Sequence, residues 1–235
     1  MNRHVQAALM FLVGGAVLHA GTTDLYLRYV KAGLRPLLLV AGVVLIIAAI
    51  ATVWYERRTR REDHDGHDHR EPRISWLLVL PLLALVLVSP PALDSYSGMR
   101  AGTTLPPHFG LTALPAGDPL RLTVSDYADR AVSEHGRSLG TRTITLTGFV
   151  AFDRNGSVYL LRMLLNCCAA DAQPVKIGLS GQVPPVLQPD TWLEVTGTYT
   201  GRQTKDPVNN GVIPFIDVTQ AKPAPAPADP YESLG

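Results

Sequence analysis

Residues 36–54 read PLLLVAGVVLIIAAIATVW, an apolar run without a single charged residue. An α-helix rises about 1.5 Å per residue, so the roughly 30 Å hydrocarbon core of a bilayer needs about 20 such residues. Core helices of soluble proteins carry a polar face, which this run lacks. Because a backbone in lipid must satisfy its own hydrogen bonds, the run predicts a transmembrane helix.

Two further apolar runs flank this one. The first covers residues 5–21, and the other covers residues 74–92 and contains a pair of prolines near its end. Together the three runs predict a transmembrane region over residues 1–92, with helices at about 5–21, 36–54 and 74–92.

The first run also has the features of a secretory signal peptide, because Arg3 precedes the apolar stretch. Cleavage after Ala20 would place Leu18 at a position where a small residue is preferred. A retained first transmembrane helix is therefore the favoured interpretation.

Basic residues in the short loops predict the orientation of the helices. Six arginines lie between Tyr55 and Arg73, whereas the loop between the first two helices holds Arg28, Lys31 and Arg35. The larger basic cluster is expected in the cytoplasm. With three spans, the N-terminus is then cytoplasmic and the C-terminal domain lies on the exterior side of the cell membrane.

The composition changes after Pro91. Residues 93–118 are rich in Pro, Gly and Ser and predict an extended linker. Residues 119–221 predict the exterior domain, with a helix at 126–135 that Ser125 caps. Its strands are expected at 141–152, 158–165, 174–179, 192–200 and 212–219, after a short alternating stretch at 120–124.

Five short strands with one helix predict an α+β protein whose exterior part is an OB-like five-stranded barrel, with a β-sandwich as the alternative. Asn155-Gly156 has the chemistry of a tight hairpin turn between the first two strands. The tail over residues 222–235, in which Pro and Ala alternate at first, is expected to be disordered.

Five strings in the C-terminal half of the chain carry a resemblance to a known family. They are ITLTGFV at residues 144–150, LRM at 161–163, CCAADA at 167–172, WLEVTGT at 192–198 and DPYE at 229–232. With the N-terminal helices, they make the chain similar to the YcgQ-type family of bacterial membrane proteins, and CCAADA is the most specific of them. The resemblance implies a partnership with a YcgR-type permease and no particular chemical activity.

The adjacent cysteines are the sharpest candidates for chemistry. Thiolates of Cys167 and Cys168 are soft ligands for zinc or another transition metal, and Asp171 can add an oxygen. A zinc site usually has about four ligands, so others have to come from elsewhere, such as His108 or His135. Two alternatives stay open: a redox pair that can form a vicinal disulfide, and a pair of buried structural thiols.

A second candidate metal site lies in the loop between the second and third helices. His64, His67 and His69 follow one another closely there, among acidic residues. Imidazoles on a flexible loop can share a transition-metal ion weakly and reversibly. The alternative is a solvated polar loop without a ligand.

Other function classes find little support in the sequence. A formal net charge of +1 gives no indication of a nucleic-acid partner. The chain lacks the common hydrolase, zinc-protease and phosphate-loop motifs, so we expect no enzyme. The prediction is a membrane-anchored accessory subunit of a permease whose exterior domain binds metal. The alternatives are a membrane-anchored thiol redox protein and a metal-binding or metal-sensing membrane protein that acts alone.

Overall fold

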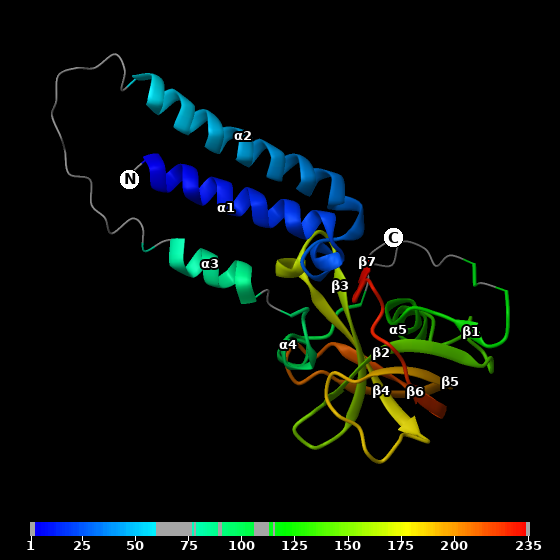
Figure 1. Ribbon diagram of the computed structural model, residues 1–235. Helices are drawn as coiled ribbons and strands as arrows, with labels where there is room; N and C mark the ends of the chain where they lie inside the picture. Colours follow the sequence, from blue (N-terminus) through cyan, green and yellow to red (C-terminus); the bar gives the residue numbers. More distant parts are fainter. Residues whose placement is uncertain are drawn as a thin grey trace. The chain divides into compact units, whose positions relative to one another are not determined.

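The computed structural model describes residues 3–59, 77, 79–88, 91–105, 113–114 and 116–233. The chain forms two compact units (Figure 1). The helical unit comprises Met1–Tyr26 and Ala32–Pro91, and the barrel unit comprises Leu27–Lys31 and Ala92–Gly235. A short segment between the first two helices thus belongs to the barrel unit.

Two long apolar helices dominate the helical unit. They are α1, Arg3–Thr22, and α2, Arg35–Thr59, and the short 3-10 helices η1, Asp24–Arg28, and η2, Ala32–Leu34, lie between them in the chain. The stretches His4–Thr22 and Ala32–Arg58 are long and apolar enough to cross a membrane.

The third predicted helix is described only in part. Helix α3, Val79–Val88, is shorter than a membrane span, and several residues of the predicted 74–92 helix lie outside the described residues. Among the described helices, two rather than the predicted three therefore have the length of a span.

Helices α1 and α2 lie side by side because two glycines allow a close approach (Figure 1). A Cβ atom on Gly14 would lie 3.0 Å from the carbonyl oxygen of Gly42, and one on Gly42 would lie 2.7 Å from Cγ of Leu18. A Cβ atom on the neighbouring Gly15 would meet open space. Small residues at such contacts are typical of helices that associate in lipid.

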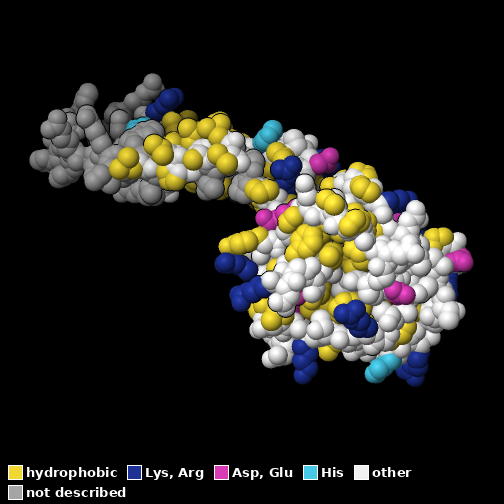
Figure 2. All heavy atoms as spheres, turned by 90° about the horizontal axis from the view of Figure 1, so that it is seen from below, with side chains coloured by type: hydrophobic (Ala, Val, Ile, Leu, Met, Phe, Trp, Pro, Cys, Tyr) yellow, Lys and Arg dark blue, Asp and Glu magenta, His cyan; other side chains and the backbone are white. Residues whose placement is uncertain are grey.

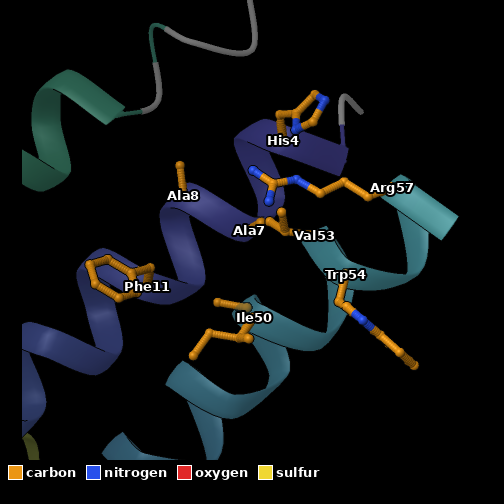
Figure 3. Close-up of a pocket in the computed structure, with 9 residues that line it drawn as sticks. His4, Ala7, Ala8, Phe11, Ile50, Val53, Trp54 and Arg57 are labelled. Carbon is orange, nitrogen blue, oxygen red and sulfur yellow. The ribbon is translucent and has the colours of Figure 1, made fainter. Parts of the chain in front are cut away.

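The outer face of α2 is apolar and exposed. Leu37, Ile47 and Trp54 are 66%, 60% and 61% exposed, and Figure 2 shows hydrophobic side chains gathered over the helices. Figure 3 shows a groove between α1 and α2, which His4 and Arg57 line at one end. Apolar side chains line most of the rest of this groove, and we assign it no ligand.

The barrel unit contains a closed five-stranded barrel. Its strands are β2, Ile144–Phe152, β3, Val158–Leu165, β4, Gln173–Gly181, β5, Trp192–Lys205, and β6, Val212–Pro223. The order around the barrel is β2-β3-β4-β6-β5, and β5 pairs with β2 to close it. All pairs are antiparallel except β4 with β6. The five predicted strands and the closed barrel are confirmed.

The barrel core forms around a helix that precedes the first barrel strand. Helix α5, Val124–Ser133, contacts four barrel strands, β2, β3, β4 and β6. Its Tyr127 is fully buried and donates a hydrogen bond to the carbonyl of Phe215 at 2.7 Å. Before α5, the short strand β1, Leu120–Arg121, pairs in parallel with β2.

Helix α5 begins two residues earlier than predicted. Thr123, rather than Ser125, is its N-cap, since the Thr123 hydroxyl accepts from Asp126 N–H at 3.0 Å. The backbone N–H of Ser125 donates instead to Glu232. The helix ends before His135 and Gly136, whose positive φ angles of 54° and 70° leave the helical region.

Two stretches predicted to be irregular contain regular elements. Helix α4, Ser95–Arg100, falls in the predicted linker, with Asp94 as its N-cap. Strand β7, Tyr231–Ser233, falls in the predicted disordered tail and pairs in parallel with β3. Both contribute to a second apolar cluster on the barrel, which includes Leu161, Met99 and Tyr231. Neither has the length or periodicity that reveals an element in sequence.

A buried ion pair holds the chain after α4 on the barrel. Lys176 Nζ lies 2.8 Å from Asp206 Oδ2, with side-chain exposures of 1% and 0%. Lys176 Nζ also donates to the carbonyl of Ala101 at 2.7 Å, and Thr103 N–H donates to Asp206 Oδ2. Burial alone would raise the pKa of Asp206, but hydrogen bonds from Lys176, Val208 and Thr103 lower it below its ordinary value of 3.8.

We expect Asp206→Asn to destabilise the barrel unit by about 3 kcal/mol, because removing one partner leaves the buried Lys176 charge uncompensated. Denaturant unfolding of the purified chain, followed by the β-sheet circular dichroism signal, measures this loss. In the parent chain, the lowered pKa of Asp206 stabilises the fold above pH 3.8, and this contribution disappears as the pH falls through the lowered value.

The matched control is Glu194→Gln. Glu194 pairs with Arg121 and Lys222, whose side chains are 71% and 60% exposed. An exposed pair contributes less than about 1 kcal/mol, so this variant should unfold almost like the parent chain. An equal loss of unfolding free energy in the two variants would contradict the larger contribution that we expect from the buried ion pair.

Candidate metal centre

The adjacent cysteines lie in the connection between β3 and β4. After β3 ends at Leu165, the chain turns through Asn166 and the two cysteines and forms a short 3-10 helix, η4, Ala169–Asp171. The Asp171 carboxylate folds back over this turn. It accepts from the backbone N–H of Cys167 at 2.8 Å and of Asn166 at 3.1 Å.

This turn brings three metal-ligating side chains together. The sulfur atoms of Cys167 and Cys168 and a carboxylate oxygen of Asp171 all lie within 4.8 Å of one another. Both thiols are free; that of Cys167 is exposed, and Cys168 and Asp171 are half-buried. Ligand atoms around one tetrahedral zinc ion lie roughly 3.5 Å apart.

The carboxylate also sets the protonation of the thiol. A hydrogen bond with Asp171, and then one with Cys168, raises the pKa of Cys167 to about 12. The same contact with Cys167 lowers the pKa of Asp171. A redox cysteine needs the opposite shift, towards thiolate. A metal cation would instead take the place of the shared proton, since metal ligation releases protons from thiols.

The other predicted ligands do not join this cluster. Among the described residues, the group consists of the two cysteines and Asp171, and His135 is not part of it. His108 lies outside the described residues, as do His64, His67 and His69 of the second candidate site. The described part of the chain therefore offers three ligands here and leaves a fourth position for water or an external donor.

The sequence does not predict the backbone segment that supports the cysteines. The segment Leu27–Lys31 pairs with them as a short antiparallel bridge, in which Val30 faces Cys168. Lys31 N–H donates to the carbonyl of Cys167 at 3.1 Å, and Ala169 N–H donates to that of Tyr29 at 2.7 Å. The β-favouring pair Tyr29-Val30 is the one signal for this contact in the sequence.

A tyrosine near the C-terminus holds the same segment. The Tyr231 hydroxyl donates to the carbonyl of Arg28 at 2.7 Å and accepts from Leu93 N–H at 3.2 Å. Burial raises the pKa of this hydroxyl. Three distant parts of the chain thus meet beside the cysteine turn.

Removing the carboxylate charge should make Cys167 more reactive. In a Cys168→Ser background with a chelator present, we expect Asp171→Asn to speed alkylation of Cys167 by iodoacetamide at pH 8 at least tenfold. The reason is that a lower thiol pKa raises the thiolate fraction, and the thiolate is the nucleophile. Mass spectrometry of the labelled chain measures the rate.

Asp153→Asn is the matched control in this experiment. Asp153 also accepts from two backbone N–H groups, those of Asn155 and Ser157, but in the turn between β2 and β3. It should leave the rate unchanged. An unchanged rate in Asp171→Asn as well would show that the carboxylate does not control the thiol.

The comparison with known families concerns this domain. Residues 116–232 match the model described as the DUF1980 C-terminal domain, a span that includes the five barrel strands, both cysteines and Glu232. No curated protein and no solved structure shows a significant match to the chain. Residues 116–232, which carry the cysteine turn, are therefore similar to the DUF1980 C-terminal domain.

Proposed function

We propose that this chain is a membrane-anchored accessory subunit of a permease, and that its exterior barrel binds a thiophilic metal ion at Cys167, Cys168 and Asp171. The observation that carries the proposal is the convergence of two sulfurs and one carboxylate within 4.8 Å. The apolar α1 and α2 support the membrane anchor.

The ligand set suits an ion that is passed on. Two thiolates and one carboxylate favour zinc or copper over magnesium or calcium, because sulfur is a soft ligand. With three protein ligands, a fourth position stays open, and the exposed Cys167 is accessible to an incoming donor. Closed four-ligand sites, by contrast, serve mainly as structural supports.

The bridge between Leu27–Lys31 and the cysteine turn supports a three-span topology. If α1 spans the membrane, the segment between α1 and α2 lies on the side of the membrane where α1 ends. Because this segment is hydrogen-bonded to Cys167 and Ala169, the barrel must lie on the same side of the membrane. Helix α2 carries the chain to the other side, so the chain must cross back before Ala92. We assign this crossing to the apolar run 74–92, and the arginine-rich loop then lies in the cytoplasm.

The barrel is of a type that commonly presents ligands. The order β2-β3-β4-β6-β5, with a parallel pair between β4 and β6, supports the OB-like assignment. OB-type barrels use their loops and one strand face for binding. In this chain the cysteine turn connects two neighbouring barrel strands, which would place the metal on such a loop.

Elemental analysis of the detergent-purified chain tests the proposal. We expect close to one zinc or copper ion per chain, and loss of that ion in Cys167→Ser/Cys168→Ser. Titration of the apo-protein with zinc should show at least tenfold weaker binding in Asp171→Asn, because one ligand charge is gone.

Asp153→Asn again provides the matched control, since it removes a half-buried carboxylate that also accepts from two backbone N–H groups, in a different turn of the barrel. It should bind zinc like the parent chain. If the parent chain carries no metal and takes up none with either ion, the site does not exist and the cysteines are structural.

Association with the permease is a separate expectation. A tagged copy of this chain should co-purify with a co-expressed YcgR-type permease, and the double cysteine variant should co-purify equally well, because apolar helices mediate the contact. Recovery of the permease at background level would exclude the subunit role and leave a metal-binding membrane protein that acts alone.

A further inference from the structure

A carboxylate from the C-terminal strand occupies the N-terminus of α5. Glu232 Oε1 accepts from Val124 N–H and Glu232 Oε2 accepts from Ser125 N–H, each at 2.9 Å. The first N–H groups of a helix have no partner within the helix, and the helix dipole favours negative charge there. Both oxygens of this buried carboxylate are therefore directed at backbone donors.

A buried guanidinium faces the same carboxylate. Arg162, on β3, has a side chain that is 10% exposed, and its Nε lies 3.5 Å from Glu232 Oε1. Its Nη2 donates to the carbonyls of Tyr231 and Asp229. The guanidinium carbon lies 4.8 Å from the centre of the Trp192 ring, within the range of a cation–π contact.

The carboxylate does not satisfy this guanidinium. Nε and Nη1 of Arg162 are buried and have no hydrogen-bond partner among the described residues. The ion pair with Glu232 is too long for a good hydrogen bond. Buried donors without partners are rare and costly, and donors on a charged group more so.

A phosphate group would satisfy both sets of donors. Each oxygen of Glu232 is held by a helix N–H group, and Oε1 stays 3.5 Å from Arg162 Nε. A phosphate group brings additional acceptor oxygens, so it can bind the helix N-terminus and the guanidinium fork together. Arginine is the side chain that best matches such an oxyanion.

The occupant, Glu232, belongs to a short strand that follows a proline-rich connection. Strand β7 pairs with β3 at only three positions, from Met163 to Leu165. The stretch that connects it to β6 is rich in Pro and Ala, with the sequence PAPAPADP at residues 223–230. If β7 left β3, the site would open without disrupting any pair of barrel strands.

We propose that Arg162 and the N-terminus of α5 form a binding site for a phosphate group, and that Glu232 occupies this site as an internal ligand. The site is separate from the cysteine turn, so the proposal does not depend on metal binding. An incoming phosphate group would replace Glu232 and release the C-terminal segment.

Calorimetric titration of the detergent-solubilised full chain with inorganic phosphate tests this proposal. We expect Glu232→Ala to bind phosphate at least tenfold more tightly than the parent chain, in which Glu232 competes. Adding Arg162→Met to that variant should return the affinity to the parent level or below. If phosphate also protects Glu232→Ala against thermal unfolding, the anion is filling the place of the missing carboxylate.

Glu194→Ala is the matched control, because it also removes a carboxylate and leaves two cations, Arg121 and Lys222, without their partner. Equal phosphate binding in this variant would reveal a general charge effect and overturn the site. Glu232→Gln serves if the alanine variant fails to fold, since it keeps the shape and one acceptor. A folded Glu232 variant that binds phosphate no better than the parent chain also overturns the proposal.

Two sources of the phosphate group can be separated in nanodiscs. With Glu232→Ala in phosphatidylcholine discs, inorganic phosphate should bind as it does in detergent. In discs that contain phosphatidic acid, a lipid headgroup that uses the site would weaken inorganic phosphate at least tenfold. An unchanged affinity assigns the site to a soluble phosphate compound. Equal weakening in discs that carry the same negative charge as phosphatidylserine would indicate surface charge alone.

Discussion

Strand β2 has to pair with two neighbours at once, and the closed barrel depends on this arrangement. Its N-terminal part pairs with β5 from Ile144, and its C-terminal part pairs with β3 up to Phe152. Both pairings overlap at Phe149, directly after Gly148. A Cβ atom on Gly148 would lie 2.7 Å from the carbonyl oxygen of Leu161, so only glycine permits β3 to approach there. Without that approach, β3 and β4 could not complete the ring, and the cysteine turn between them would have no fixed frame.

Two carboxylates in the barrel unit make similar hydrogen bonds to the backbone but favour different ligands. Asp171 and Glu232 each accept from two backbone N–H groups and thereby fix a turn or a helix start. Asp171 lies near the surface beside two thiols, so its negative charge favours a cation there. Glu232 lies buried against a guanidinium and thus balances a charge that is already present. The surroundings of each carboxylate, rather than its own hydrogen bonds, decide which ligand it favours.

Much of the architecture follows from local patterns in the sequence. The apolar run at 36–54 and the alternation of Ile144, Leu146 and Val150 require no distant partner to be interpreted, and α2 and β2 lie where these patterns predict them. The proximity of Cys167, Cys168 and Asp171 is also local, because the three lie within one turn. Such features could be predicted because the period or spacing of the residues along the chain is itself what forms the helix, the strand or the turn.

Other features arise only when distant segments meet. Strand β7 is too short for a pattern, and it exists because β3 offers an edge for it. The start of α5 depends on Thr123 and on an acceptor more than a hundred residues away, Glu232. Ser125 is an equally good cap by composition, so propensity alone could not choose between the two. The bridge of Val30 with Cys168 is of the same kind, since neither segment contains a strand signal longer than two residues.

The contact of Tyr231 with Arg28 has a consequence for the order in which the chain assembles. These residues are 203 positions apart, and a chain grows from its N-terminus at about 5–20 residues per second. For at least about eight seconds after α1 and α2 have been made, the segment between them therefore has no complete barrel to pair with. The cysteine turn, the barrel and the last few residues must all be synthesised before that segment acquires its partners. A chain that stops short of Tyr231 would leave the carbonyl of Arg28, between its first two helices, without this hydrogen bond.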